Sequence, residues 1–247
     1  MRLNQYLARC GLGSRRGVEE FILGGRVTVN GSVQSALALQ VEEGDVVALD
    51  GRPVCPASLL TVLLHKPRGF LCTSSDPRGR QTVYDLLPPR WSNLRYIGRL
   101  DRDSEGLLLF TSDGLLIQRL AHPRHKVPKV YEVDCDRPLD VARVGTLLRG
   151  CRIQGRTASL DAFHLLGSRR LRVVLHQGMK RQIRLMFQSL GYKVVRLVRV
   201  AFGPLALGSL AAGQYRLLSR SETEALLHAA APAPPTARGR RRARSSL

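Results

Sequence analysis

The chain has 247 residues, and its 39 Lys and Arg against 19 Asp and Glu give a formal net charge of +20 at pH 7. This excess of positive charge favours a polyanionic partner, and nucleic acid is the first candidate. No apolar run reaches about 18 residues, so we expect no transmembrane helix and no membrane partner. The five cysteines form no Cys-x-x-Cys pair, which argues against a disulfide framework or a zinc site and predicts a cytoplasmic protein.

The first 50 residues predict a small unit of helices and short strands. Apolar residues at helical spacing predict a helix over residues 2–10, and Ser14 is placed to cap a second helix that ends near residue 23. Residues 26–33 alternate in polarity and turn at an Asn-Gly dipeptide, which is typical of a two-residue hairpin. A further strand is expected at residues 45–49.

This order of elements resembles the S4 RNA-binding domain. The resemblance depends on residues 14–16, which read Ser-Arg-Arg, and on residues 25–31. It implies that Arg15, Arg16 and Arg26 bind RNA, since phosphate is favoured near helix N-termini. Each arginine taken alone would be a solvated surface charge.

Beyond residue 55 the sequence predicts a linker, a larger domain and a tail. Residues 56–58 are the linker, and residues 59–228 are the larger domain. Strands are expected at residues 59–64, 107–110, 130–134, 157–163, 171–175 and 194–200. Helices are expected between residues 114 and 123 and at residues 141–148, 179–190 and 221–229. Residues 229–247 turn to Ala and Pro and then to Arg, which predicts a disordered basic tail.

Four acidic residues lie close together around the expected strand at residues 107–110. The spacing of Asp101, Asp103 and Glu105 is similar to the first residues of a twelve-residue calcium-binding loop. Counted from Asp101, the twelfth residue is Ser112, whereas such a loop needs a bidentate Glu there. We therefore expect no metal site. Asp113 precedes the next helix and is expected to cap it.

Two interpretations of the acidic loop remain. Arg99 and Arg102 could pair with the acids, and for Asp103 and Glu105 we favour such a structural role. Alternatively, one of the acids is a catalytic carboxylate in a basic site that faces RNA.

The loop resembles the signature of bacterial ribosomal RNA pseudouridine synthases, in the branch with an N-terminal S4 domain. Residues 98–101 and 106–114 match it. Further matching segments, in order along the chain, are residues 65–69, 75–80, 83–88, 122–123, 129–133, 178–186 and 196–205. The resemblance implies an α+β fold: an S4 domain at residues 1–55, then a mixed, mainly antiparallel synthase sheet with flanking helices.

The resemblance also implies roles for four residues. Asp101 would be the catalytic carboxylate, and Arg184 would be its ion-pair partner. Tyr131 would stack on the target base and take a proton from C5, and Arg99 would contact the RNA backbone or fill the gap left by the extruded base. From the residues alone, Tyr131 also fits a half-buried strand tyrosine, and Arg184 fits a surface helix charge equally well.

The implied reaction converts specific uridines of ribosomal RNA to pseudouridine without gaining atoms, so no cofactor is expected. The partner would be ribosomal RNA or a pre-ribosomal particle, and the protein would act as a monomer. Met179, Leu185 and Val198 stand where the family usually has a basic residue, which bears on the RNA helix that is bound. The rival hypotheses are a non-catalytic RNA-binding ribosome-assembly factor and a metal-dependent RNA enzyme. The sequence selects neither a target uridine nor a subunit, nor between a nucleophilic and a glycal mechanism.

Overall fold

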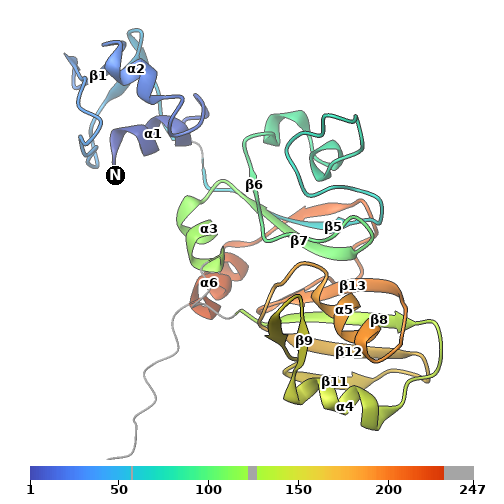
Figure 1. Cartoon of the computed structure of the whole chain (residues 1–247). Coiled ribbons are helices and arrows are strands. Elements are labelled where there is room, and N and C mark those ends of the chain that lie inside the picture. The colour runs from blue at the N-terminus through green and yellow to red at the C-terminus, as the bar shows by residue number, and fades with distance from the viewer. Residues whose placement is uncertain (57, 122–126, 231–247) are drawn as a thin grey trace, which may run out of the picture.

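The computed structural model describes residues 1–56, 58–121 and 127–230. Figure 1 shows a small N-terminal unit, in blue, and a larger part built around one sheet. The helices are α1 (Leu3–Arg9), α2 (Glu19–Leu23), η1 (Val83–Leu86), η2 (Pro89–Trp91), α3 (Gly114–Ala121), α4 (Val141–Arg149), α5 (Gln182–Ser189) and α6 (Arg220–Ala229).

The strands of the described residues fall into three sheets. The N-terminal sheet holds β1 (Val27–Val29), β2 (Ser32–Val33), β3 (Val47–Leu49) and β4 (Arg52–Pro53), and a two-stranded sheet holds β9 (Cys151–Ile153) and β10 (Arg156–Ala158). The large sheet holds β5 (Thr61–Lys66), β6 (Arg95–Ile97), β7 (Glu105–Thr111), β8 (Lys129–Cys135), β11 (Ala162–Leu165), β12 (Arg170–Leu175), β13 (Val194–Phe202), β14 (Leu205–Ala206) and β15 (Tyr215–Leu217).

The N-terminal unit has the predicted hairpin and its own core. Asn30 and Gly31 join β1 to β2 with φ values of 52° and 79°, as a two-residue hairpin turn requires. The second helix begins at Glu19, later than expected, because Ser14 caps a turn by accepting a hydrogen bond from Gly17 N at 3.0 Å. The buried core of this unit is Leu3, Leu7, Val18, Ile22, Val27, Val29, Val41 and Val47.

The large sheet is mixed and mainly antiparallel, as predicted. Its strand order is β11-β12-β8-β13-β7-β5-β15, and β7 with β13 is the one parallel pair among the described strands. One edge of β7 pairs with β5 along its length, whereas the other edge meets β13 at its start and β6 at its end. The start of β7, directly after the acidic loop, is therefore joined to the β8 and β13 half of the sheet.

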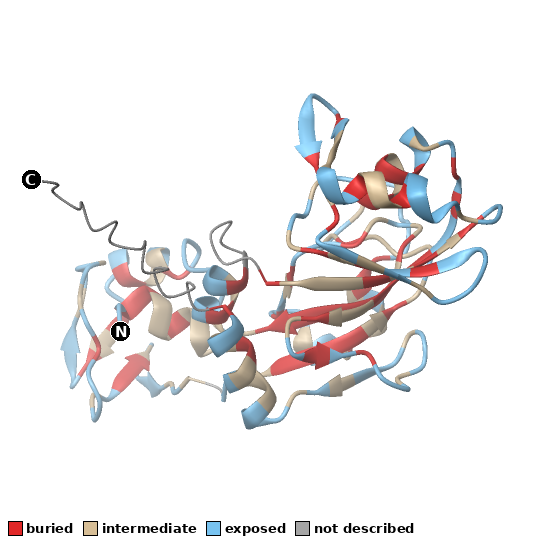
Figure 2. Cartoon of the chain, turned by 90° about the horizontal axis from the view of Figure 1, so that it is seen from below, coloured by how far each residue is buried: buried red, intermediate tan, exposed pale blue. Residues whose placement is uncertain are grey.

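Helices cover this sheet on both faces, and Figure 2 shows the central strands buried between them. Helices α4 and α5 pack with β8 and β12 in one apolar cluster, and α3 and α6 pack with β7 and β13 in another. Leu107 and Leu109 of β7 belong to the second cluster, while Leu108 and Phe110 belong to the first. The apolar run in the sequence is continuous because both faces of β7 are buried.

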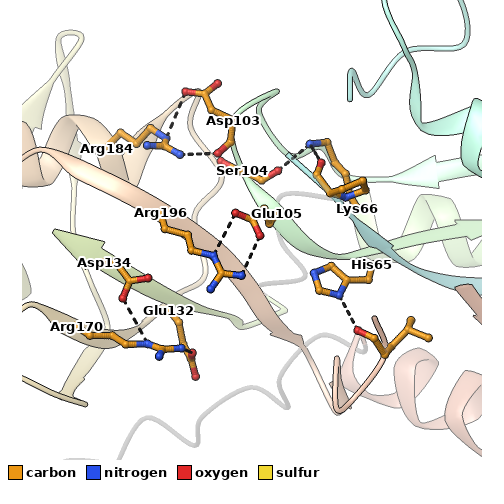
Figure 3. A network of polar contacts seen from close by, with 12 residues as sticks. His65, Lys66, Asp103, Ser104, Glu105, Glu132, Asp134, Arg170, Arg184 and Arg196 are labelled. Carbon is orange, nitrogen blue, oxygen red and sulfur yellow. Dashed lines mark hydrogen bonds and ion pairs between the residues drawn. The ribbon is translucent and has the colours of Figure 1, made fainter. Parts of the chain in front are cut away.

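A ladder of ion pairs lies on one face of strands β12, β8 and β13 (Figure 3). This face points away from α4 and α5. Glu132 of β8 accepts hydrogen bonds from Arg170 at 2.5 Å and Arg172 at 2.7 Å, both on β12. Arg196 of β13 binds both carboxylate oxygens of Glu105 at the start of β7. These cross-strand pairs support the register of four neighbouring strands.

The expected elements differ from the structure in a few places. The strand expected at 157–163 is divided into two strands, β10 and β11. The chain leaves the strand path between them because Leu160 is buried in the core and its N–H donates a hydrogen bond to Leu147 O. Helix α5 begins at Gln182, three residues late, because Arg181 adopts a left-handed conformation with φ 54°. The His122-Pro123 match and residues 231–247 of the predicted tail lie outside the described residues.

Candidate active site

The acidic loop borders a cavity of about 610 Å³ where β8, β13 and the segment before α5 meet. Asp101 and Tyr131 both line this cavity, so the structure brings together two residues that are 30 positions apart. The walls include the apolar side chains of Leu100, Ile183 and Leu197. Four exposed basic residues also line it: Arg99, Arg102, Lys180 and Arg181.

A buried lysine holds the main chain of the loop (Figure 3). Lys66, at the end of β5, is 0% exposed, and four carbonyl oxygens lie within hydrogen-bond distance of its Nζ and share its three N–H groups. These acceptors are Ser104 O at 2.7 Å, Pro67 O at 3.0 Å, Asp101 O at 3.2 Å and Arg102 O at 3.3 Å. Burial lowers the pKa of Lys66 below its ordinary value, and neighbouring acids partly oppose this effect. The carbonyl cage compensates a cation that burial would otherwise disfavour.

The carboxylate of Asp101 is left free. Within the described residues it forms no hydrogen bond or ion pair, although it is partly exposed to the cavity. Its backbone is fixed, since Asp101 O accepts hydrogen bonds from Ser104 N at 3.0 Å and from Lys66. A rigid backbone that presents an unpaired carboxylate into a cavity is suited to covalent or proton-transfer chemistry.

Strands β7 and β13 approach each other closely at Gly106, directly after the acidic loop. Gly106 of β7 has φ +107°, and a Cβ there would lie 2.3 Å from Arg199 O of β13. A residue with a side chain would therefore push β13 away from β7. Gly106 brings β13, and with it the side of the cavity formed by Arg199, against the start of the strand that follows Asp101.

Tyr131 and Arg199 face each other across β8 and β13 in register. Tyr131 is 8% exposed and Arg199 is 2% exposed, and both line the cavity. The Nε of Arg199 donates to Leu107 O at 2.7 Å, whereas its Nη2 has no acceptor among the described residues.

Arg184 does not pair with Asp101, so the ion pair implied by the resemblance is wrong for this structure. Arg184 Nη2 donates to Asp103 O at 2.8 Å, Nη1 donates to Val194 O at 2.8 Å, and Nε lies 3.9 Å from Asp103 Oδ2. These contacts turn the guanidinium toward a neighbouring, more open recess that it shares with Arg68. Burial lowers the pKa of Arg184, and Asp103 opposes that effect.

The other acids of the loop are structural, but their partners differ from the expected ones. Asp103 pairs with Arg181 at 3.1 Å, and Glu105 pairs with Arg196 of β13. Arg99 and Arg102 pair with neither acid within the described chain. Asp113 caps α3 as predicted, because its Oδ1 accepts a hydrogen bond from Leu115 N at 2.8 Å. The described residues contain no cluster of three or more His, Cys, Asp or Glu suited to a metal ion.

The three S4 arginines divide into two groups. Arg26 binds Asp50 through two hydrogen bonds, 2.9 Å and 2.5 Å long, and its guanidinium also lies 4.8 Å from the Phe21 ring centroid. Arg15 and Arg16 are exposed and unpaired within the described chain. Arg26 is therefore already engaged, whereas Arg15 and Arg16 can take a phosphate directly.

Sequence reasoning missed three cavity residues. Lys129 lies two positions before Tyr131 and so shares its face of β8, and Arg199 lies two positions after Leu197 on β13. A basic residue at an apolar-face position of a strand was the available signal in both cases. Gln182 binds Met179 N at 3.1 Å and Gln177 Oε1 at 3.0 Å, and so shapes the cavity wall before α5. That role depends on loop geometry and left no signal in the sequence.

Comparison with known proteins identifies the families that this chain resembles. A family model described as RNA pseudouridylate synthase matches residues 60–189, and an S4 domain model matches residues 1–47. Ribosomal large subunit pseudouridine synthase B of Bacillus subtilis is 35% identical over 233 residues, which cover 91% of this chain and 95% of the relative. Its namesake in Pseudomonas aeruginosa is 39% identical over 240 residues, which cover 91% of this chain and 61% of the relative.

A solved structure gives the same result at the level of the fold. The crystal structure of a pseudouridylate synthase aligns with a TM-score of 0.65 and 28% sequence identity, covering 92% of this chain and 99% of that one. No helix among the described residues is long and apolar enough to span a membrane. The matches extend from the N-terminal unit through the large sheet, and so the chain belongs to the RNA pseudouridine synthase family, in the branch with an N-terminal S4 domain.

Proposed function

We propose that this enzyme isomerises uridines of ribosomal RNA, with Asp101 as the catalytic carboxylate. The observation that carries the proposal is the unpaired Asp101 carboxylate, held by its backbone in a cavity that Tyr131 also lines. The four exposed basic residues of the cavity give it the charge that an RNA strand requires.

The reaction breaks the bond between C1′ and N1 and forms a bond between C1′ and C5. A proton leaves C5 and N1 gains one, so atoms balance without a cofactor. Asp101 either attacks as a nucleophile or removes a sugar proton to give a glycal. Tyr131 stacks on the base and accepts the C5 proton. Because the reacting atoms are shielded in a stacked helix, the nucleotide must be extruded into the cavity, where Arg99 contacts the RNA backbone.

Ribosomal RNA is the proposed substrate because two of the relatives are named ribosomal large subunit pseudouridine synthase B. The S4 domain adds a second RNA contact through Arg15, Arg16 and Arg26. We extend the proposal to a cytoplasmic protein that acts as a monomer on ribosomal RNA or a pre-ribosomal particle.

The test is release of tritium from ribosomal RNA transcripts that carry 5-tritiated uridine. The wild type is expected to release tritium, and Asp101→Asn is expected to release none, because an amide neither attacks carbon nor accepts the proton. Asp103→Asn is the matched control, since Asp103 serves a structural ion pair. Full activity in Asp101→Asn, or no release by the wild type, would refute the proposal.

A further inference from the structure

Two cations of the cavity take no part in the chemistry assigned to Asp101 and Tyr131. Arg199 and Lys129 lie on the sheet side of the cavity, on β13 and β8, and Arg199 is 2% exposed. The other basic residues that line the cavity are exposed and can meet RNA phosphates. The deeper position of Arg199 and Lys129 calls for a different ligand group.

Arg199 presents a donor that nothing in the described chain satisfies. Its Nε is fixed on Leu107 O at 2.7 Å, which sets the plane of the guanidinium, and its buried Nη2 has no acceptor. A buried donor without an acceptor costs free energy, so such a group calls for a ligand or another explanation. Because arginine only donates, the missing partner is an oxygen or nitrogen acceptor.

Lys129 lies beside Arg199. Its Nζ donates to Val127 O at 2.9 Å and His176 O at 3.2 Å, which leaves one of its three N–H groups. The Nζ of Lys129 and the Cζ of Arg199 lie 5.5 Å and 5.6 Å from the Phe202 ring centroid. Burial, together with the Arg199 charge, lowers the pKa of Lys129 to about 8, so most of its side chains still carry the proton at neutral pH.

We propose that Arg199 and Lys129 donate hydrogen bonds to the carbonyl oxygens of the extruded uracil and thereby select uracil over cytosine. This proposal rests on the proposed function. Leu100, Ile183, Leu197 and the Tyr131 ring form apolar walls that suit the faces of a planar base, and the two donors suit its polar edge. Phosphates stay with the RNA strand outside the cavity, within reach of the exposed arginines.

Uracil chemistry explains why two donors are useful. The O2 and O4 atoms are both acceptors, and turning the ring about the axis through N3 and C6 exchanges them while it exchanges N1 with C5. The same two donors can therefore hold the base before and after the rotation that isomerisation requires. Cytosine carries an amino donor in place of O4, which would face Arg199 or Lys129 without an acceptor.

The experiment measures RNA affinity with an atomic change in the base. The uridine that the wild type modifies in a ribosomal RNA stem-loop is replaced by 4-thiouridine or by cytidine. Dissociation constants for the three RNAs are measured by fluorescence anisotropy in the full-length Asp101→Asn background, where bound uridine is not converted. Arg199→Gln and Lys129→Gln are added separately to this background, and Arg172→Gln, on the opposite face of the sheet, is the control.

The Asp101→Asn protein without further substitutions, here called the parent, should bind the uridine RNA at least about tenfold more tightly than either other RNA. A difference of this size is expected for a matched donor pair. Arg199→Gln should reduce this preference to about twofold, and Arg172→Gln should keep it. If Arg199 had only a structural role, its substitution would weaken the binding of all three RNAs by the same factor. Thermal melting identifies the variants that fold, and Lys129→Gln provides a second test through the other donor.

Two results would overturn the proposal while the proposed function stands. In the first, the wild type isomerises uridine, but the Asp101→Asn parent binds the three RNAs with equal affinity. The other is an unchanged preference in both folded variants. A wild type that modifies no uridine would overturn the proposed function, and this inference with it.

Discussion

Lys66 binds the main chain of Asp101 rather than its carboxylate: Lys66 Nζ lies 3.2 Å from Asp101 O, and three further carbonyls complete the cage. The lysine therefore fixes where Asp101 stands and leaves its side chain free. A direct ion pair would have occupied the carboxylate. The printed contacts of the cation are all with main-chain oxygens, which suits a positioning role.

Lys66→Met should remove the one side chain that links four carbonyls of the loop and its neighbours, and so let the Asp101 loop shift. We expect kcat to fall by about 100-fold, since displacement of a reacting group by about 1 Å has an effect of that size. KM for ribosomal RNA should change little, because the exposed arginines remain. Steady-state tritium release measures both constants. Lys193→Met, at an exposed lysine, is the control, and an equal loss there would contradict the positioning role.

Gly106→Ala should separate β7 from β13. The new Cβ would meet Arg199 O at 2.3 Å, and Ala would also have to adopt φ +107°. We expect the free energy of unfolding to fall by about 3 kcal/mol or more, measured by urea denaturation. Gly114→Ala is a matched control eight positions on, because its Cβ has open space and it begins a helix. That variant should stay within about 1 kcal/mol of the wild type.

The exposed S4 arginines should contribute to RNA affinity through phosphate contacts. For Arg15→Gln and Arg16→Gln, the slope of log affinity against log salt should fall by about 0.7–0.9 per arginine. Arg26→Gln should mainly lower the melting temperature, because Arg26 already binds Asp50. Anisotropy titrations with a ribosomal RNA transcript at several salt concentrations give the slopes. A larger slope change for Arg26 than for Arg15 would show that its ion pair opens on RNA.

Glu132 should make stability depend on pH. Burial raises its pKa, but hydrogen bonds from Arg172 and Arg170 outweigh that effect and hold the pKa below its ordinary value of 4.5. The ionised form is therefore favoured by folding, and its contribution is complete above about pH 4.5 and is lost as the pH falls through the folded-state pKa.

Glu132→Gln should accordingly lower Tm by about 2–4 °C at neutral pH, and the difference should shrink under acid conditions. Differential scanning calorimetry across the pH range measures both effects. Glu224→Gln removes the partner of Arg220, which is 94% exposed, and should have almost no effect. A Tm difference for Glu132→Gln that is independent of pH would contradict the ion-pair explanation.

Local chemistry explains which features the sequence could predict. The Asn30-Gly31 hairpin, the Asp113 cap and the buried strand before it each depend on neighbouring residues, and each is present. The position of Asp101 at the entrance to β7 was predictable for the same reason.

Long-range pairing could not be predicted in this way. Arg184 was expected to pair with Asp101, but its Nη2 reaches the main chain at Asp103, 81 positions away. Lys66 and Arg199 donate hydrogen bonds to backbone carbonyls. Every residue has such a carbonyl, so the sequence does not indicate which ones are bound. Their roles emerge only when distant strands are laid side by side.

The parallel contact between β7 and β13 has a consequence for folding. It joins the half of the sheet that presents Asp101 to the half that presents Tyr131, and Arg199 binds Leu107 across 92 positions of sequence. Contacts of such long range require the closure of a long loop, and the entropy cost of that closure slows their formation. The helices and hairpins of each half can exist before the site does, so recovery of catalysis during refolding should lag behind recovery of secondary structure.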